Sequence, residues 1–343
     1  MSDRSNIEWT DASWTPIRAR RSGVGSDGEP WGRIGWYCEH ATVGCEFCYA
    51  ESMNKRLGTG LPFKPGHRKD VEIFLDDEML QAPLRWKKPR MIFVCSMTDL
   101  FADFVKDEWI DKMLAIAALC PQHTFQILTK RAERMCRYMS DTTVSSIGGG
   151  DVCSRVAAQC ATHRNVAFAE TVTPAKIRYC WPLENCWLGV SCERQQEADE
   201  RIPLLLQTPA AVRFISAEPL LAPIDLTRIH EEFDGGLGHS WESCLNGKRF
   251  SPWGGDGNGG DTSGHAALDW VIVGGESGPN ARPMQIEWAD SIVAQCEAAG
   301  VACFVKQLGA APLSDGYPLH LRSAKGGDQA EWPERLRVRE MPA

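Results

Sequence analysis

The sequence lacks any run of about 18 consecutive apolar residues, which is the shortest stretch that spans a membrane as a helix. It also lacks the apolar core of a secretory signal, because Met1–Arg4 leads directly into polar sequence. Global disorder is excluded, since 43% of the residues are hydrophobic and only 24% are charged. We therefore expect a folded, cytoplasmic protein with no membrane partner.

An excess of positive charge is also missing. Lys and Arg number 37 against 45 Asp and Glu, which gives a formal net charge of -8. A protein that coats nucleic acid needs the opposite sign, so a histone-like function is excluded. A local basic groove remains compatible with this balance.

Disulfide bonds are not expected, although the chain holds 14 cysteines. The cytosol keeps thiols reduced, so these cysteines are either metal ligands or small buried hydrophobic residues. Their spacing along the chain has to distinguish the two roles.

Short apolar runs alternate with segments of helical spacing. Runs without polar alternation are typical of strands that are buried on both faces of a parallel sheet. The expected strands are Met91–Cys95, Thr124–Leu128, Trp187–Val190, Val212–Ile215, Asp269–Val273 and Val301–Val305, with Val71–Leu75 and Ser13–Ile17 as further candidates. The expected helices are Asp76–Trp86, Lys106–Leu119, Arg131–Met139, Arg194–Gln207 and Glu287–Ala299, and another helix starts near Tyr49. Strand and helix repeated about six to eight times predict a parallel α/β barrel, TIM-barrel-like and complete or partial, with a doubly wound open sheet as the alternative.

We expect one domain over residues 1–343 with two long insertions. The first insertion, residues 142–184, separates a helix from the next strand. The second, residues 234–265, is a Gly-rich loop whose Trp253–Asp261 segment predicts no regular structure. Residues 310–343 form a C-terminal extension, in which Trp332–Arg339 is expected to pack back on the barrel.

Polar residues follow nearly every expected strand, at the end where α/β barrels place their active sites. Because acids and bases gather there in succession, we expect ligand-binding side chains among them. The residues concerned are Ser96, Asp99, Thr129, Lys130, Arg131, Ser191, Glu193, Ser216, Glu218, Glu276, Ser277, Lys306 and Gln307. Capping of the following helices is the alternative explanation for any one of them.

The strongest chemical signal is a cysteine loop that contains Cys38, Cys45 and Cys48. Three thiolates in one short loop, after an expected strand and before an expected helix, form a compact ligand set. Structural zinc sites have four ligands and are closed, whereas a 4Fe–4S cluster held by three cysteines leaves one iron open to an external ligand. The cysteine count therefore favours a catalytic iron–sulfur cluster.

The segment Cys45-Glu-Phe-Cys48, preceded by a third cysteine, resembles the cluster loop of the radical S-adenosylmethionine superfamily, although the spacer after Cys38 is longer than usual. The resemblance implies that Cys38, Cys45 and Cys48 hold a 4Fe–4S cluster whose open iron binds S-adenosylmethionine. Reductive cleavage of this cofactor would yield a 5′-deoxyadenosyl radical that abstracts hydrogen from the substrate. The resemblance also implies an electron donor such as flavodoxin or ferredoxin, and it places Phe47 near the adenine.

A wider set of segments is similar to a phage and bacterial family that is described as radical-SAM-like and has no assigned function. The segments are Ser13–Pro16, Gly44–Glu51, Leu84–Arg90, Phe93–Phe101, Gln122–Arg131, Trp187–Ser191, Arg201–Leu206 and Val271–Gly278. Gly274, Gly275 and Glu276 look like the motif that receives the amino group of S-adenosylmethionine. Lys130 and Arg131 are expected to meet the cofactor carboxylate or a substrate phosphate. From their place at the barrel rim, the other expected cofactor-binding residues are Ser191, Glu193, Ser216 and Glu218.

Other interpretations of the cysteines stay open. His40 lies close to Cys38, so a zinc site that stabilises a non-enzymatic nucleic-acid or protein binding module is the alternative to an iron–sulfur enzyme. Four cysteines in or beside the first insertion are either unligated thiols or ligands of a second metal site: Cys153, Cys160, Cys180 and Cys186. Cys95, Cys192 and Cys303 lie near strand ends, and either they are buried or they face the barrel mouth. Cys95 is the candidate catalytic thiol, which would donate a hydrogen atom to a substrate radical.

The expected substrate is DNA. Basic segments alternate with tryptophans at Arg18–Arg21, Lys87–Arg90 and Lys130–Arg134, a pattern that can follow a phosphate backbone and stack bases. Phages carry similar proteins, which also favours DNA, with photolesion repair by a lyase or base modification as the expected reaction. A small metabolite or a peptide is the alternative substrate.

Overall fold

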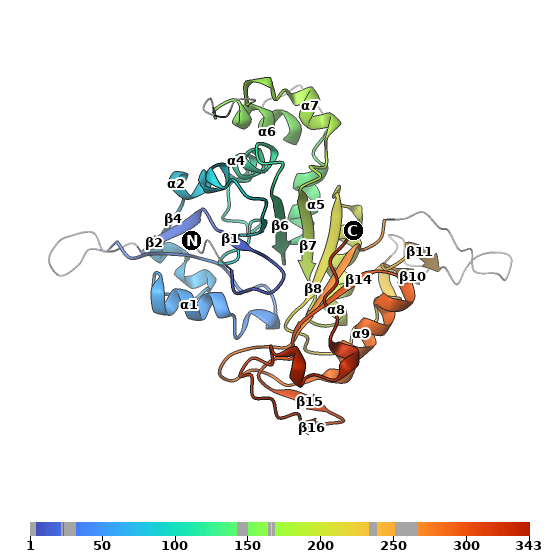
Figure 1. The fold of residues 1–343 in the computed structure, drawn as a ribbon. Helices are drawn as coiled ribbons and strands as arrows, with labels where there is room; N and C mark the ends of the chain where they lie inside the picture. Colours follow the sequence, from blue (N-terminus) through green and yellow to red (C-terminus); the bar gives the residue numbers. More distant parts are fainter. Residues whose placement is uncertain are drawn as a thin grey trace. The chain divides into compact units, whose positions relative to one another are not determined.

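The structure is a computed structural model that describes residues 5–21, 23, 32–142, 150–163, 166, 169–232, 239–250 and 266–343. The chain divides into two compact units (Figure 1). The first unit comprises Met1–Trp187 and Pro209–Ala211, and the second comprises Leu188–Thr208 and Val212–Ala343.

A seven-stranded sheet contains most of the predicted strands. Its order is β1 (Ala12–Trp14), β5 (Met91–Val94), β6 (Thr124–Thr129), β7 (Cys186–Ser191), β8 (Val212–Ala217), β12 (Trp270–Gly274) and β14 (Ala302–Gln307). The pairs β1–β5, β5–β6, β8–β12 and β12–β14 are all parallel, as the continuous apolar runs predict. A mixed α/β fold with a parallel sheet is thus confirmed. Within the described residues β1 and β14 are the edges of this sheet, which corresponds to a partial barrel rather than a closed TIM barrel.

The long predicted helices are present with nearly the predicted bounds. They are α1 (Tyr49–Leu57), α4 (Asp107–Ala118), α5 (Ala132–Ser140), α8 (Gln195–Gln207) and α9 (Ile286–Ala299). The predicted helix Asp76–Trp86 is instead two short helices, α2 (Asp77–Leu80) and α3 (Ala82–Arg85). Pro83 explains the break, because a residue without an N–H cannot continue the hydrogen-bond ladder of α2.

Val71–Leu75 does not belong to the main sheet, so its assignment as a barrel strand is wrong. It forms β4, which pairs antiparallel with β2 (Ile17–Arg21), and β2 pairs in turn with β3 (Ile34–Gly35). The candidate first strand Ser13–Ile17 is likewise divided, since β1 ends at Trp14 and Ile17 opens β2. A five-residue apolar run cannot distinguish a parallel from an antiparallel strand, because its pairing partner is set elsewhere in the chain.

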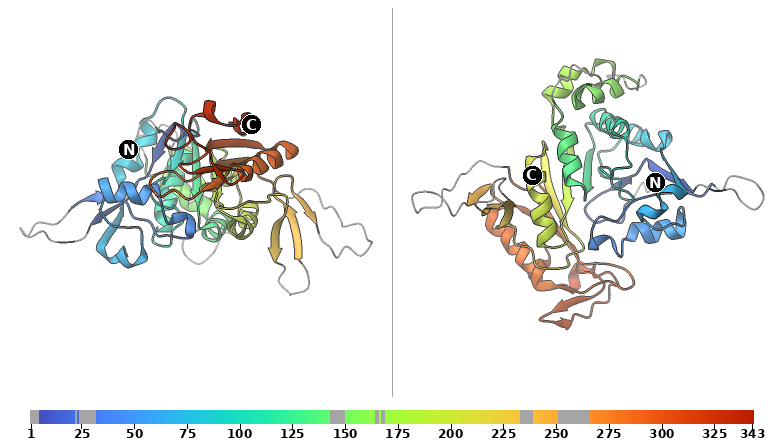
Figure 2. Two further views of the ribbon diagram at one scale, coloured as in Figure 1. Left: turned by 90° about the horizontal axis from the view of Figure 1, so that it is seen from below. Right: turned by 180° about the vertical axis from the view of Figure 1, so that it is seen from behind.

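The first insertion contains α6 (Val152–Cys160), η3 (Ala169–Thr171) and α7 (Pro174–Tyr179). Helix α6 packs on α4, and α7 packs on α6 (Figures 1 and 2). The described part of this insertion therefore extends the helical covering of the first unit. Residues 143–149, 164, 165, 167 and 168 lie outside the described part of the chain.

The second insertion was expected to be a loop, and this expectation is wrong for its centre. There β10 (His239–Ser243) pairs antiparallel with β9 (Ile229–Glu232) and with β11 (Lys248–Phe250). Gly247 takes a positive φ of 64° in the turn that joins β10 to β11, a conformation for which glycine is favoured. The segment Trp253–Asp261 lies outside the described residues.

The C-terminal extension returns to the second unit's part of the sheet, as predicted for Trp332–Arg339. Its elements are β15 (Pro312–Ser314), which pairs with β13 (Met284–Gln285) and β16 (Tyr317–Pro318), and then η4 (Gln329–Glu331) and η5 (Glu334–Leu336). The Val305 N–H donates to Val338 O at 2.9 Å, and the Glu340 N–H donates to Cys303 O at 2.8 Å. These bonds cover the edge strand β14, whose backbone groups would otherwise be unpaired on that side.

Aromatic side chains fill the core of each unit. In the first unit, the rings of Trp14 and Phe125 meet edge to face with centroids 5.5 Å apart. In the second unit, the Trp270 ring lies 5.7 Å from that of Phe214 and 6.0 Å from that of Phe304. The Trp270 indole donates to Glu340 O at 2.9 Å, which satisfies its polar atom and fixes the C-terminal segment.

Candidate functional site

The cysteine loop lies in the first unit between β3 and α1. Cys38 follows β3, Cys45 ends the short helix η1 (Val43–Cys45), and Cys48 directly precedes α1. Cys38 and Cys48 both pack against one buried apolar cluster. The members of that cluster are Ala50, Phe63 and Met97. At least two of the three thiols are therefore next to the same apolar surface, as the close spacing of the cysteines predicts.

Asn54 on α1 ties the segment before this loop to the segment that follows α1. Its Oδ1 accepts the N–H of Trp36 at 2.9 Å and that of Thr59 at 3.1 Å, while its Nδ2 donates to Thr59 Oγ1 at 2.8 Å and to Leu61 O at 3.0 Å. The side chain is only 1% exposed. Gly35 allows this close approach, because a Cβ there would lie 2.6 Å from Asn54 Oδ1.

Glu51, one turn before Asn54, holds the interior of the loop. Its carboxylate accepts from His40 Nε2 at 2.7 Å and from the Phe63 N–H at 2.9 Å, and it forms an ion pair with Lys55. Burial acts to raise the pKa of Glu51, but the hydrogen bonds from Lys55, Phe63 and His40 outweigh burial and lower that pKa. The Nε2 of His40 is thus bound to a carboxylate, which fixes the orientation of the ring.

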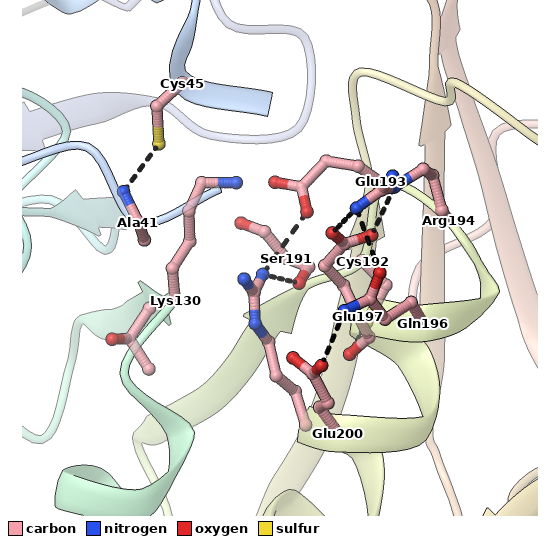
Figure 3. A network of polar contacts seen from close by, with 12 residues as sticks. Ala41, Cys45, Lys130, Ser191, Cys192, Glu193, Arg194, Gln196, Glu197 and Glu200 are labelled. Carbon is pink, nitrogen blue, oxygen red and sulfur yellow. Dashed lines mark hydrogen bonds and ion pairs between the residues drawn. The ribbon is translucent and has the colours of Figure 1, made fainter. Parts of the chain in front are cut away.

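The thiols of the loop have a mixed environment. Burial raises the pKa of Cys38, and the charges of Asp99, Cys48 and Cys45 raise it further. Burial also raises the pKa of Cys48, although backbone N–H groups at the start of α1 and the charge of Lys130 act in the opposite direction. The Ala41 N–H donates to Cys45 Sγ at 3.4 Å (Figure 3). Thiols with raised pKa values stay protonated at neutral pH unless a metal cation stabilises the thiolates.

Two buried polar atoms near the loop have no hydrogen-bond partner among the described residues, namely Trp36 Nε1 and Thr42 Oγ1. Trp36 packs against the same apolar cluster as Cys38 and Cys48. A buried donor without an acceptor costs about 1–3 kcal/mol, so it indicates an acceptor that belongs to the site. The sulfides of an iron–sulfur cluster accept such hydrogen bonds. The residues of the loop therefore fit a cluster of this kind.

The described residues contain no group of at least three His, Cys, Asp or Glu side chains that are close enough to hold a metal ion. A 4Fe–4S cluster binds its cysteines at separate corners of a cube, so its ligands lie further apart than those of one ion. The charges of Cys45 and Cys48 both act on Cys38, so the three thiols share one electrostatic environment.

Asp99 joins the ends of β5 and β6 beside the loop. Its carboxylate accepts from Thr129 Oγ1 at 2.6 Å and from the Lys130 N–H at 2.9 Å, and it is buried. Arg131 follows, and its Nη2 donates to Glu39 O at 3.0 Å. The predicted residues Lys130 and Arg131 therefore do lie next to the cysteine loop. For Arg131 the described partner is the backbone of that loop.

Cys95 lies in the same part of the first unit. It is buried directly after β5 and has a positive φ of 55°, which is uncommon for a residue other than glycine. Burial raises its pKa well above the usual value, and the charges of Asp99 and Cys38 act in the same direction. The predicted catalytic thiol is thus a protonated group within electrostatic range of Cys38.

Among the predicted rim residues of the second unit, Glu193 forms an ion pair, while Ser191 and Ser216 accept hydrogen bonds through their backbone carbonyls. Glu193 after β7 is fully buried with Arg201, whose Nη1 also donates to Ser191 O at 2.5 Å. Arg194 binds Glu197 through two nitrogens, one at 2.5 Å and one at 3.1 Å (Figure 3). The carbonyl of Ser216 accepts the Cys192 N–H at 2.9 Å, so this contact of Ser216 joins the ends of β7 and β8.

A second group of contacts follows β8, β12 and β14. Glu218 Oε1 accepts from Lys306 Nζ at 2.6 Å and from Gln307 Nε2 at 3.3 Å. Both carboxylate oxygens of Glu276 accept from Arg282, at 2.6 Å and 2.9 Å. The acidic residue of the Gly274–Glu276 motif is therefore bound to a guanidinium in this structure.

The glycines of that motif have a packing role. A Cβ at Gly275 would lie 2.3 Å from Leu308 O, and a Cβ at Gly274 would lie 3.2 Å from the Glu218 side chain. Any larger residue at Gly275 would have to displace the backbone that follows β14. Close approach between β12 and β14 thus explains Gly275 without reference to a ligand.

Several other sequence-predicted cysteines are structural. Cys160 Sγ contacts Ala115 O at 3.7 Å between α6 and α4, and Cys153 is fully buried. Cys192 is buried with its Sγ 3.9 Å from Glu197 O. Cys303 lies at the amino end of β14, so its placement at the barrel mouth is wrong. Cys180, by contrast, is exposed after α7, and Cys186 is buried at the start of β7.

The basic segments differ in their positions. Arg20 on β2 pairs with Glu72 at 3.1 Å and lies 5.0 Å from the centre of the Phe74 ring. Lys87–Arg90 precede β5, at the opposite end of that strand from Cys95. The second segment is therefore not part of the cysteine site.

Two residues of the site were missed by the sequence reasoning, namely Glu51 and Asn54. They are three positions apart on α1, so they lie on the same side of that helix, which is the buried side. A pair of polar residues at this spacing, directly after the last cysteine, is the signal that would have identified them.

The fold and the site define a mixed α/β protein with a parallel partial-barrel sheet and a cysteine loop held by Asn54 and Glu51. None of the helices in the described part of the chain has the length and apolar character needed to cross a membrane. Residues 29–331 match the family described as "protein of unknown function (DUF5131)", and the chain belongs to this family. No curated protein and no solved structure matches the chain.

Proposed function

We propose that this protein is a radical S-adenosylmethionine enzyme in which Cys38, Cys45 and Cys48 hold a 4Fe–4S cluster. The observation that carries the proposal is that the partly buried thiols of Cys38 and Cys48 share one packing cluster with Trp36, whose buried Nε1 donor has no partner among the described residues. Three cysteine ligands leave one iron open, which suits a cofactor-binding rather than an electron-storing cluster.

When bound, the cluster supplies the electron that cleaves S-adenosylmethionine. The chain's own residues hold the surroundings: Asn54 binds the Trp36 N–H at the start of the loop, and Glu51 binds His40. Arg131 holds the Glu39 carbonyl, and the charge of Lys130 acts on Cys48. The electrostatic role we assign to Lys130 is to stabilise the thiolates of the loop.

Cys95 is assigned the role of hydrogen-atom donor. Its raised pKa keeps the thiol protonated at neutral pH, which is the form that carries a transferable hydrogen. Glu276 is left out of the cofactor-binding set in this proposal, because Arg282 binds both of its oxygens.

Cofactor cleavage by the anaerobically reconstituted protein tests the proposal. With dithionite and S-adenosylmethionine, the wild-type protein should release 5′-deoxyadenosine and methionine, which mass spectrometry quantifies. Cys45→Ala should abolish this release, whereas Cys136→Ala, which removes a partly buried cysteine on α5, should not. Equal release by both variants, or none by the wild type with a full complement of iron, would refute the proposal.

For the substrate we propose DNA. The supporting observation is the surface of β2, where the exposed Arg20 lies against Phe74 and Arg18 lies 4.9 Å from the Trp36 ring. Cations beside aromatic rings suit a phosphate backbone with stacked bases. Irradiated and intact duplexes are the first substrates to offer. Arg20→Glu should weaken DNA binding at low salt, while the charge reversal of Lys87, on the far end of β5, should not; equal effects would contradict this assignment.

A zinc-stabilised binding module is the alternative function. The described residues bring together no group of three His, Cys, Asp or Glu side chains that could hold one metal ion, which argues against a zinc site. Purified protein that holds zinc in a one-to-one ratio and no sulfide would establish the alternative.

A further inference from the structure

Helix α1, drawn in blue in Figure 1, carries exposed apolar side chains at a spacing of four residues. Met53 and Leu57 are 36% and 60% exposed, and Tyr49, one turn earlier, is 49% exposed while its hydroxyl donates to Ser96 O at 2.8 Å. The three residues follow one another at intervals of four. That interval places the three side chains along one side of the helix. The inner side of the same helix is the one that carries the buried Glu51 and Asn54.

An exposed row of three large apolar residues is a costly feature for a helix whose other side is packed. Contiguous apolar patches on protein surfaces mark sites of interaction. Val43, on η1 within the cysteine loop, is also 43% exposed and adds to the apolar surface of this segment. The outer side of α1, defined by Tyr49, Met53 and Leu57, is therefore a candidate docking face.

Positive charge predominates in the segment that contains this face. In the segment 32–69 the exposed cations are Arg33, Lys55, Arg56, Lys64, Arg68 and Lys69, and the one exposed anion is Glu46. The whole chain, by contrast, has a formal net charge of -8. Arg33 lies directly at the helix, because its Nη2 donates to the Arg56 carbonyl at 3.2 Å. A basic segment on an acidic protein selects a partner of negative charge.

The position of the face indicates what such a partner would do. Helix α1 begins at Tyr49, immediately after Cys48, and Asn54 on its inner side binds the Trp36 N–H at the start of the cysteine loop. A protein seated on the outer side of α1 would thus bring its own redox group close to the loop. Apolar contact with a charged rim and a small area is typical of transient redox complexes.

We propose that the outer side of α1 is the docking face for an acidic one-electron carrier protein of the flavodoxin or ferredoxin type. This inference rests on the proposed function, since it requires a cluster at Cys38, Cys45 and Cys48. One electron leaves the reduced carrier, which is oxidised, and enters the cluster, which is reduced. The aliphatic side chains of Met53 and Leu57 favour a protein over a nucleic acid, whose phosphates would gain nothing from them.

The test compares two variants of the cluster-loaded, full-length protein. Met53→Glu with Leu57→Glu adds negative charge and removes the apolar stripe. Tyr179→Glu is the matched control, because Tyr179 is a 92% exposed apolar residue on α7 of the same unit. The probe is a photoreduced flavodoxin of net negative charge, and stopped-flow absorbance follows electron transfer to the cluster at low and high salt. Dithionite, which needs no docking face, serves as the reference reductant.

We expect the double variant to take up iron like the wild type, to be reduced normally by dithionite, and to lose about tenfold or more in its rate with flavodoxin. The control should keep its rate, and added salt should slow the wild type. The docking proposal would be overturned if the double variant accepted electrons from flavodoxin at the wild-type rate. It would also be overturned if the double variant lost DNA binding while its reduction by flavodoxin was unchanged. Neither result would contradict the proposed cluster. Absence of iron from the wild type would instead overturn the proposed function and this inference with it.

Discussion

Replacement of Asn54 by alanine should release the start of the cysteine loop from α1. The buried amide makes four hydrogen bonds at 2.8 to 3.1 Å, to Trp36 before the loop and to Thr59 and Leu61 after α1. In Asn54→Ala the N–H groups of Trp36 and Thr59 and the carbonyl of Leu61 lose this partner. Each unsatisfied buried group costs about 1–3 kcal/mol, so three of them would cost about 3 kcal/mol even at the low end of that range.

Urea unfolding followed by tryptophan fluorescence measures this loss, and iron content after reconstitution measures its effect on the loop. We expect the free energy of unfolding to fall by about 3 kcal/mol and the bound iron to fall with it. Ser52→Ala, an exposed position on the same helix, is the control and should change neither quantity. A loss below about 1 kcal/mol, or full iron binding by the destabilised variant, would refute the role given to Asn54.

Three further predictions concern single residues. Gly275→Ala should destabilise the protein by about 1–3 kcal/mol in urea unfolding, because the new Cβ would lie 2.3 Å from a backbone oxygen. Gly66→Ala is the control and should be neutral, because nothing lies within 4 Å of a Cβ there. Equal stability of the two variants would contradict the packing role of Gly275. Burial acts to raise the pKa of Glu197, but Arg194 outweighs it and lowers that pKa, so the stabilisation exists above the ordinary carboxyl pKa and is lost as the pH falls. Glu197→Gln should therefore be less stable at pH 7 and should show a smaller loss of unfolding free energy between about pH 5 and pH 3; an unchanged pH profile would count against the ion pair. Trp36→Phe should make the cluster potential more negative in an EPR-monitored redox titration, because it removes a buried N–H donor, and an unshifted potential would show that the indole does not reach the cluster.

Much of the main sheet was predictable because its strands are encoded locally. Continuous apolar runs such as Val301–Val305 correspond to strands like β14, and a strand buried on both faces needs no other signal. Val71–Leu75 shows the limit, since its sequence does not specify whether it joins β2 or the parallel sheet. Likewise, β14 spans Ala302–Gln307 rather than the predicted Val301–Val305, so Cys303 lies at the amino end of the strand.

The site was predictable only in part, because local spacing locates the cysteines but does not specify their long-range contacts. The cysteine loop was located from spacing, because its three ligands lie within eleven residues of the chain. The contacts that hold it were not, since the pairing of Asn54 with the Trp36 backbone depends on how β3 approaches α1. The ion pair between Glu276 and Arg282 shows the converse case, in which a motif that suggests ligand binding is satisfied within the chain.

The central claim is that Cys38, Cys45 and Cys48 hold a site-differentiated iron–sulfur cluster. The most direct measurement is anaerobic purification followed by iron and sulfide analysis, with EPR of the reduced protein before and after S-adenosylmethionine is added. We predict about four irons per chain, a matching amount of sulfide, and an EPR signal that changes when the cofactor binds. Stoichiometric zinc without sulfide, even after reconstitution with iron, would contradict the claim and leave these cysteines a structural role.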